Sequence, residues 1–364
     1  MNRATKSSPP SGPDLPPSTL NPIRGGAAAK GAPLALSAVI PLYNCLALTR
    51  ACVESLQATL PSGLDHEIIL IDDGSTDGTR DWLASLDSSA FRVLLNDRNC
   101  GYAAANNRAA TTARGRFLIL LNNDLNFRAR WLEPMLEAHR ELGARAGVIG
   151  NVQVNFRNGA IDHAGIVIGL QGKPRHERAL PARPFRRPNA WQVVPAVTGA
   201  CLLVERALWE TLDGFDEAYV NGGEDIDFCF RARAKRRINA VALSSVVEHH
   251  VSSSPGRKRC DEQNSLRLAR RWGREFLACA DAGAREWCRN HLAAALAEPR
   301  SAEFALTLRA AAHLLGLRRR PPAQAVLGLE ENLAREFARW ETLFGRDVPG
   351  LSPNEAPPVA TIRS

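Results

Sequence analysis

The sequence predicts an α/β protein with a doubly wound, mostly parallel sheet flanked by helices and a helical extension at its C-terminal end. Two observations carry this prediction. Over residues 36–121, short runs of Val, Ile and Leu alternate with segments that have the apolar spacing of helices, a pattern typical of parallel strands covered on both faces. From about residue 275 to residue 345 the chain is instead rich in Ala, Leu, Arg and Glu, which favours helices.

The elements of the sheet follow in order along the chain. We expect buried strands at residues 35–40, 67–71, 91–95 and 116–121, and helices at residues 46–60, 77–86 and 102–114. After about residue 150 we expect strands at 148–156, 161–170 and 191–203, a Pro- and Arg-rich loop at 171–190, and helices at 205–212 and 224–236.

These patterns divide the chain into four segments. Residues 1–35 are rich in Pro, Ser, Gly and Ala without periodicity, which is typical of a disordered tail. Residues 36–273 are expected to form the α/β domain, residues 274–348 a helical region, and residues 349–364 a loose tail.

Composition restricts the class of protein. The chain has 364 residues, of which 45% are hydrophobic and 23% charged, as in ordinary globular proteins. The net charge of +8 comes mostly from arginines spread along the chain, with dense runs at 183–187, 235–237 and 318–320. Solvated basic faces explain these runs, and attraction to anionic lipid headgroups is the functional alternative. No nucleic-acid module surrounds them, so we do not expect a nucleic-acid partner.

The cysteines and the N-terminal residues indicate the compartment. Eight cysteines occur without C-x-x-C spacing, which fits a reducing compartment rather than a disulfide framework or a zinc site. The first residues contain no apolar signal-peptide core, and no window approaches the roughly 18 apolar residues of a membrane span. We therefore expect a cytoplasmic protein, with any membrane contact peripheral and on the inner face.

Polar residues follow the first two predicted strands. Ligands of open parallel sheets bind beyond the carboxyl ends of the strands. Pro41, Tyr43 and Asn44 follow the first strand, and Asp72 and Asp73 follow the second. Carboxylates at that position can accept hydrogen bonds from a base or a ribose hydroxyl. A turn with a helix cap explains the next residues, 75–78, well and the acid pair less well.

The third and fourth strands are followed by a second polar set. Gly101, with Asn107 further on, opens the next helix, and small residues there allow close approach to a ligand. Asn122, Asn123 and Asp124 follow the fourth strand. An acid at this place can reach a metal that bridges two phosphates, since Mg²⁺ and Mn²⁺ prefer oxygen ligands. A plain turn is the alternative.

Acids and histidines occur later in the chain. Gly223 precedes Glu224, Asp225 and Asp227 at the start of a predicted helix. Acids there are often only caps, but three acids behind two glycines exceed what capping needs, and one carboxylate could act as a general base. His249 and His250 follow an apolar run, so that one of them is either a metal ligand or a structural hydrogen-bonding group.

The order of these motifs resembles that of the family 2 glycosyltransferases, which have a GT-A fold. The resemblance runs from about residue 37 to residue 273. It rests on the segments VIPLYN (39–44), IDDGSTDGT (71–79), N-x-GY (99–102), NND (122–124), TGACLLV (198–204), GFDE (214–217) and GEDID (223–227).

The resemblance implies a role for each matching residue. Asp124 would bind the metal that holds the donor diphosphate, with His249 or His250 completing the site. Asn122 stands where the family carries its first acid, which puts strict metal dependence in doubt. Asp225 would be the catalytic base, with Glu224 beside it. The nucleotide-sugar side would comprise Pro41, Tyr43, Asn44, Asp72, Asp73, Gly101, Asn107 and Asn123, and the acceptor side Thr198, Gly199, Gly223 and Asp227.

The activity implied by the resemblance is inverting hexosyl transfer from a nucleotide-sugar donor to a saccharide or lipid-linked acceptor, with Mg²⁺ or Mn²⁺ as cofactor. The segment from Asp162 to His176 resembles the branch acting on bacterial surface polysaccharides, which includes rhamnosyltransferases. A sugar-phosphate nucleotidyltransferase would need a Gly-rich loop after the first strand, which residues 40–44 lack. A catalytically inactive homologue serving as a scaffold is the other alternative, and Asn122 alone favours it.

Overall fold

A computed structural model describes residues 34–180, 190–250, 260–298 and 303–345. The expected tail at 349–364, and all but the last two residues of the expected tail at 1–35, lie outside the described residues. So does most of the second half of the loop expected at 171–190.

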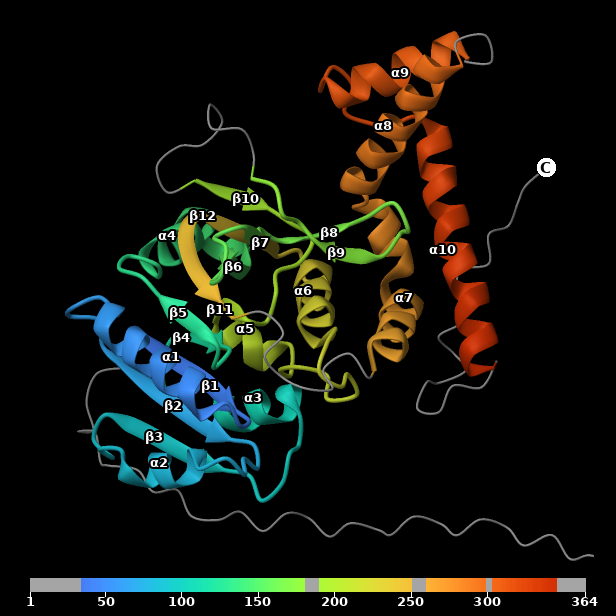
Figure 1. Cartoon of the computed structure of the whole chain (residues 1–364). Helices are drawn as coiled ribbons and strands as arrows, with labels where there is room; N and C mark the ends of the chain where they lie inside the picture. Colours follow the sequence, from blue (N-terminus) through green and yellow to red (C-terminus); the bar gives the residue numbers. More distant parts are fainter. Residues whose placement is uncertain (1–33, 181–189, 251–259, 299–302, 346–364) are drawn as a thin grey trace, which may run out of the picture.

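A mixed sheet forms the centre of the molecule (Figure 1). Its strands run in the order β10-β12-β6-β11-β4-β1-β2-β3, with β5 and β7 paired to β12 and β6. The pairs β1–β2, β1–β4, β2–β3 and β6–β12 are parallel, and β11 is antiparallel to both of its neighbours. The bounds are β1 (Leu36–Leu42), β2 (His66–Asp72), β3 (Phe91–Leu95), β4 (Phe117–Leu121), β5 (Leu125–Phe127), β6 (Ala146–Asn155), β7 (Ile161–His163), β10 (Trp191–Val193), β11 (Cys201–Glu205) and β12 (Ile238–His249).

Helices cover both faces of this sheet, which confirms the doubly wound α/β fold. The helices are α1 (Leu46–Thr59), α2 (Thr79–Ser85), α3 (Tyr102–Ala110), α4 (Glu133–Leu142), α5 (Arg206–Thr211) and α6 (Glu224–Ala234). In β1, Ala38 and Ile40 pack in the core with α1, α2 and α4, while Val39 packs in the core with α3, α5 and α6. Because successive strand residues face opposite sides, a strand buried on both faces is apolar throughout.

Two of the expected strands are broken. The single strand expected at 161–170 is wrong: β7 ends at His163, and β8 (Ile166–Ile168) pairs with β9 (Pro174–His176) in a separate two-stranded sheet. Gly165 makes this change of direction at a φ of +113°, and a Cβ there would lie 2.7 Å from Val194. The strand expected at 191–203 is interrupted, because β10 ends at Val193 and β11 begins only at Cys201.

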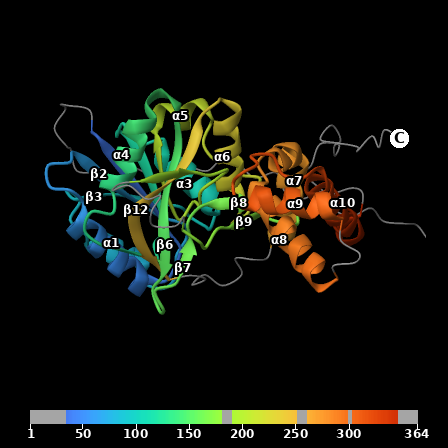
Figure 2. The ribbon, with the colours of Figure 1, turned by 90° about the horizontal axis from the view of Figure 1, so that it is seen from above.

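Four helices form a helical arm on the side of the sheet that carries α6 and the β8–β9 hairpin (Figures 1 and 2). They are α7 (Asp261–Ala278), α8 (Asp281–Ala297), α9 (Phe304–Leu314) and α10 (Ala323–Phe344). Helix α7 runs across the boundary expected at residue 273, so the division into domains stays a prediction. In the described residues no helix combines the length and apolar character that crossing a bilayer requires.

The arm is attached to the β8–β9 hairpin at close range. Asn332 of α10 donates a hydrogen bond to the Leu170 carbonyl (2.7 Å), and the Lys173 ammonium lies 2.7 Å from the Glu336 carboxylate. A Cβ on Gly283 of α8 would lie 2.5 Å from the Gly169 carbonyl oxygen. The helical arm therefore supports the hairpin directly.

Candidate active site

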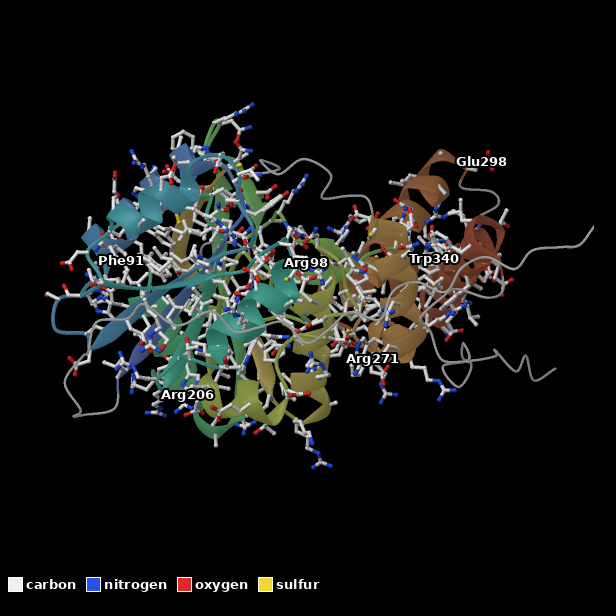
Figure 3. All side chains as sticks on the ribbon, turned by 90° about the horizontal axis from the view of Figure 1, so that it is seen from below. Phe91, Arg98, Arg206, Arg271, Glu298 and Trp340 are labelled. Carbon is white, nitrogen blue, oxygen red and sulfur yellow. The ribbon has the colours of Figure 1, made fainter. Side chains whose placement is uncertain are left out.

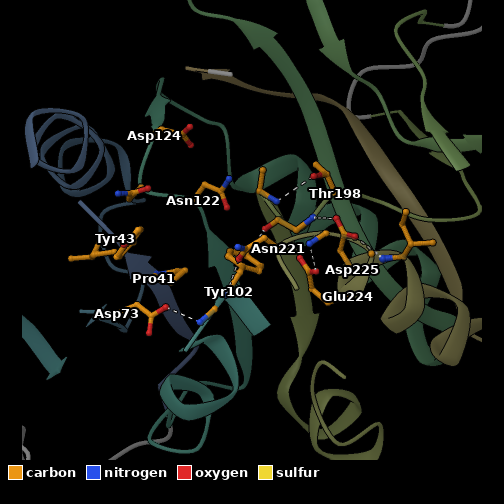
Figure 4. Close-up of a pocket in the computed structure, with 18 of the residues that line it drawn as sticks. Pro41, Tyr43, Asp73, Tyr102, Asn122, Asp124, Thr198, Asn221, Glu224 and Asp225 are labelled. Atoms are coloured by element: carbon orange, nitrogen blue, oxygen red, sulfur yellow. Dashed lines mark hydrogen bonds between the residues drawn. The ribbon is translucent and has the colours of Figure 1, made fainter. Parts of the chain in front are cut away.

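A pocket opens beyond the carboxyl ends of β1, β2 and β4 (Figure 4). The residues that line it come from nine stretches of the chain, at positions 41–43, 73, 99, 101–102, 122–124, 166, 176, 198–200 and 221–226. It brings together twelve of the predicted residues, namely Pro41, Tyr43, Asp73, Gly101, Asn122, Asn123, Asp124, Thr198, Gly199, Gly223, Glu224 and Asp225. Six other predicted residues do not line it: Asn44, Asp72, Asn107, Asp227, His249 and His250.

Asp73 organises the wall of the pocket next to α3. Its carboxylate accepts hydrogen bonds from the Asn96 side chain (2.7 Å) and from the backbone N–H groups of Cys100 and Gly101 (2.9 Å each). These bonds fix the loop that opens α3. Tyr43 also lines the pocket and exposes 45% of its surface.

Asp72 and Asn44 shape the turns instead of facing the pocket. Asp72 is fully buried, and its carboxylate accepts hydrogen bonds from Gly74 and Ser75 N–H and from Arg80 Nε (2.8 Å). Asn44 Oδ1 accepts a hydrogen bond from Thr76 N–H (2.8 Å), which joins the turn after β1 to the turn after β2. Both residues therefore act through backbone geometry.

Asp124 and His249 face each other beside the pocket. Asp124 is 9% exposed, and its Oδ1 lies 3.3 Å from His249 Nε2. Within the described part of the chain, neither of these buried atoms has a hydrogen-bond partner, and neither has His249 Nδ1. The ring of His250 stacks instead on Phe156, with ring centroids 3.9 Å apart. Of the two histidines, His249 is thus the one beside the acid.

These orphaned atoms fit a divalent cation. Buried polar atoms without partners are costly and call for an explanation. A carboxylate oxygen and an imidazole nitrogen are both metal ligands, and Mg²⁺ or Mn²⁺ commonly takes one or two protein ligands together with substrate phosphates. Among the described residues no cluster of three or more His, Cys, Asp or Glu side chains could hold an ion by itself, so the remaining ligands would come from substrate, water or amide oxygens such as that of Asn122.

Asp225 lies on the opposite wall of the pocket, at the start of α6 (Figure 4). Its Oδ2 accepts a hydrogen bond from Gly199 N–H (2.7 Å) and its Oδ1 one from Ile226 N–H (2.8 Å). Tyr102 donates its hydroxyl hydrogen to the Gly199 carbonyl (2.7 Å). Glu224 accepts a hydrogen bond from Gly222 N–H (2.8 Å) and is 5% exposed. The Asp225 carboxylate is thus oriented by backbone donors at the edge of the pocket.

Asp227 and Asn107 support the site from behind. Asp227 is fully buried and pairs with Arg231 (2.7 Å), Arg271 (3.0 Å) and Trp272 Nε1 (2.8 Å). Figure 3 shows Arg271 at the junction of α6 and the helical arm. Asn107 exchanges two hydrogen bonds with the backbone of Phe215 (2.8 and 2.9 Å).

The β8–β9 hairpin adds two residues that were not predicted for the site. Ile166 and His176 line the pocket. Nδ1 of His176 lies 3.4 Å from Nδ1 of His163, which is fully buried. Burial, together with the neighbouring His176 and His249, holds the pKa of His163 well below its ordinary value. Asn221 also lines the pocket, and only its place before the two glycines could have drawn attention to it.

Comparisons with known proteins show which family the chain resembles. Residues 37–212 match the family described as Glycosyl transferase family 2. The chain is 31% identical over 231 residues to the O-antigen biosynthesis protein RfbC of Myxococcus xanthus, covering 60% of this chain and 17% of RfbC. It is 28% identical over 216 residues to an N-acetylglucosaminyl-diphospho-decaprenol L-rhamnosyltransferase of Mycobacterium tuberculosis, covering 52% and 68%. The chain thus spans less than a fifth of the length of RfbC.

One solved structure shows the same fold. The structure of GalNAc-T7 with UDP, GalNAc and Mn²⁺ superposes with a TM-score of 0.54 at 19% identity, covering 77% of this chain and 55% of that one. This likeness confirms the GT-A fold.

Proposed function

This chain is a member of glycosyl transferase family 2, and on this premise we propose that it transfers a sugar from a nucleoside-diphosphate sugar to an acceptor hydroxyl, with inversion at the anomeric carbon. One observation carries the proposal. A single pocket has an Asp124–His249 pair beside one wall and an oriented carboxylate, Asp225, on the other.

The donor would lie along the wall that follows β1, β2 and β4. The exposed ring of Tyr43 and the loop held by Asp73 suit a base and ribose. Asp124 and His249 would hold Mg²⁺ or Mn²⁺, which when bound stabilises negative charge on the leaving diphosphate. Asn123 donates a hydrogen bond to Thr49 (2.8 Å) and so fixes the loop that carries Asp124.

The acceptor would enter beside Asp225. Its hydroxyl oxygen forms a bond to the anomeric carbon while the bond from that carbon to the diphosphate oxygen breaks, and the hydroxyl proton passes to the Asp225 carboxylate. Attack on the face opposite the leaving group inverts the anomeric configuration. Gly199 and Ile226 N–H orient the carboxylate toward this task, and a positioned base of this kind contributes roughly 10²–10⁴-fold in rate.

The acceptor class follows from the relatives. The printed names of two relatives refer to O-antigen biosynthesis and to transfer onto a diphospho-decaprenol. We therefore propose a saccharide or lipid-linked acceptor in cell-surface polysaccharide synthesis, and a hexosyl donor.

A panel of nucleotide sugars tests the function, with donor turnover measured with and without Mn²⁺. We expect one donor to be turned over, and Asp225→Asn to lower that rate by about 10²–10⁴-fold. Asp216→Asn is the matched control, because Asp216 lies outside the pocket lining and should retain the rate. Asp124→Asn should remove the response to Mn²⁺.

Two outcomes contradict the proposal. Full activity in Asp225→Asn would place the base elsewhere. If no nucleotide or nucleotide sugar raises the melting temperature, with or without Mn²⁺, the chain is a binding or scaffold homologue, since a ligand that binds the native state must stabilise it.

A further inference from the structure

Helix α9 is apolar on two faces. Its eleven residues include one formally charged side chain, Arg309. Leu306, Ala310 and His313 form the buried face. That face is held to α8 by hydrogen bonds from Arg285 to the Leu314 carbonyl (2.9 Å) and between His291 and Thr307 (3.2 Å). Figure 1 shows α9 at the end of the arm that lies away from the sheet.

The second face of α9 is open to solvent. Phe304 is 81% exposed, Leu308 60%, Leu315 74% and Leu317 80%. Spacings of four and seven residues place Phe304, Leu308 and Leu315, the residue at the end of the helix, along one side. Leu317 follows directly after the helix end, beyond Gly316. We call these four residues the apolar stripe. Large contiguous apolar surface is uncommon on a protein that meets only water and marks an interaction site.

Arginines border the apolar stripe. Arg318, Arg319 and Arg320 follow Leu317 directly, and all three are exposed, as is Arg309. Over residues 303–320 the only acid is Glu303. An apolar helix face bordered by arginines has the composition of helices that lie in the plane of a membrane interface.

The charge favours a membrane over a second copy of the chain. In a symmetric dimer the same patch meets itself, so the arginines around each stripe would approach arginines of the partner. A bilayer with anionic headgroups supplies an apolar boundary for the leucines and negative charge for the guanidinium groups, which bind phosphate in bidentate geometry.

We propose that the apolar stripe and its arginines are a docking surface for a lipid bilayer that contains anionic headgroups. Phe304, Leu308, Leu315 and Leu317 insert at the level of the headgroups, and Arg318–Arg320 pair with lipid phosphates. Binding is peripheral and reversible, and it does not depend on the transferase activity.

Co-sedimentation with vesicles tests the proposal on the full chain. We expect the protein to sediment with vesicles of phosphatidylcholine plus phosphatidylglycerol, to bind phosphatidylcholine alone much less, and to be released by salt. The double variant Leu308→Glu/Leu315→Glu should weaken binding by at least about tenfold, because it removes buried apolar area and adds negative charge. Arg318→Gln/Arg319→Gln/Arg320→Gln should lower binding of the anionic vesicles by about tenfold or more.

Controls separate docking from folding. Leu343→Glu changes a leucine of α10 that is 55% exposed and lies outside the apolar stripe, and it should bind as the wild type does. All variants should keep the wild-type melting temperature, since they change exposed side chains. Equal binding of neutral and anionic vesicles, no vesicle binding, or unchanged binding in both stripe variants would overturn the proposal. A dimer that dissociates in Leu308→Glu/Leu315→Glu, without vesicle binding, would identify a second copy as the occupant instead.

Discussion

The sheet region and the helical arm each hold one wall of the pocket in place, but they do so by different means. The wall after β1 and β2 is held by bonds between neighbouring turns: Asn44 contacts the turn that begins at Asp72, and Asp73 holds the loop before α3. The β8–β9 wall is held by α8 and α10, more than a hundred residues further along the chain. The first wall is thus fixed by local sequence, and the second depends on tertiary packing.

Asp227 provides the largest test of how the arm is attached. It lies on α6 and pairs with Arg271 and Trp272 of α7. Asp227→Ala removes this contact to the arm and also leaves Arg231 of α6, which is 15% exposed, without its carboxylate. Because a largely buried charge is then uncompensated, the variant should lower the free energy of unfolding by ~3–5 kcal/mol, measured by urea denaturation.

The matched control for Asp227→Ala is a change of Asp216, which contacts the same arginine, Arg271. Asp216 lies 3.1 Å from Arg271, and both side chains are about one third exposed. Asp216→Ala should cost less than ~1 kcal/mol. Similar small losses in both variants would show that the buried pair does not hold the arm.

Gly283→Val tests the contact between α8 and the hairpin. The new Cβ would lie 2.5 Å from the Gly169 carbonyl oxygen. The backbones of α8 and the hairpin would therefore have to move apart, which should lower the free energy of unfolding by ~1–3 kcal/mol. We also expect faster amide hydrogen exchange in residues 166–176. Gly273→Ala on α7 is the control: its Cβ would meet only Leu333 at 3.6 Å, and a helical Gly-to-Ala change should be neutral or stabilise by up to ~1 kcal/mol.

The smallest expected effects are changes of stability with pH, which differ between the sheet region and the helical arm. Burial lowers the pKa of His139 on α4 below its ordinary value of 6.5. The unfolded chain therefore binds the proton more readily, and stability should fall as the pH drops below 6.5. Equilibrium unfolding at pH values above and below 6.5 should show a shallower pH dependence in both His139→Gln and His139→Phe. The prediction is contradicted if these variants keep the wild-type pH dependence.

The arm should respond at lower pH. Burial opposes ionisation of Glu336, but hydrogen bonds from Lys173 and Arg339 lower its pKa below the ordinary 4.5. A lowered carboxyl pKa contributes stability that is present above 4.5 and is lost as the pH falls through the folded value. The loss of stability from His139 should therefore begin as the pH falls below 6.5, and the loss from Glu336 should begin only below 4.5.

The sequence predicted most of the sheet because its parallel strands are buried on both faces and appear as unbroken apolar runs. Asp73 and Asp124 were predicted because acids that follow parallel strands meet at one edge of the sheet, and Asp225 because three acids follow two glycines at the start of a helix. Asp72 and Asp227 satisfy the same two patterns but are buried in ion pairs. Asp227 has one partner a helical turn away, Arg231, but its other two partners, Arg271 and Trp272, lie about 45 residues further along the chain, and a local pattern does not reveal them.

The hairpin shows the other limit of sequence-based prediction. His176 reaches the pocket only because the chain leaves the sheet at Gly165 and pairs β8 with β9. An apolar run such as residues 161–170 does not reveal that change of direction. The open face of α9 was also not predicted, since it depends on which side α8 covers.

The close approach of Gly169 to Gly283 has a consequence for recombination between related proteins. The backbone at these two positions leaves no room for a side chain on Gly283, so the hairpin and the helical arm have to be inherited as a matched pair. A chimera that takes its sheet region from one relative and its arm from another would need a glycine at the position of Gly283 and a hairpin of the same length. A crossover before the hairpin keeps the hairpin and the arm together, and it exchanges only the part of the pocket lining that lies between residues 41 and 124.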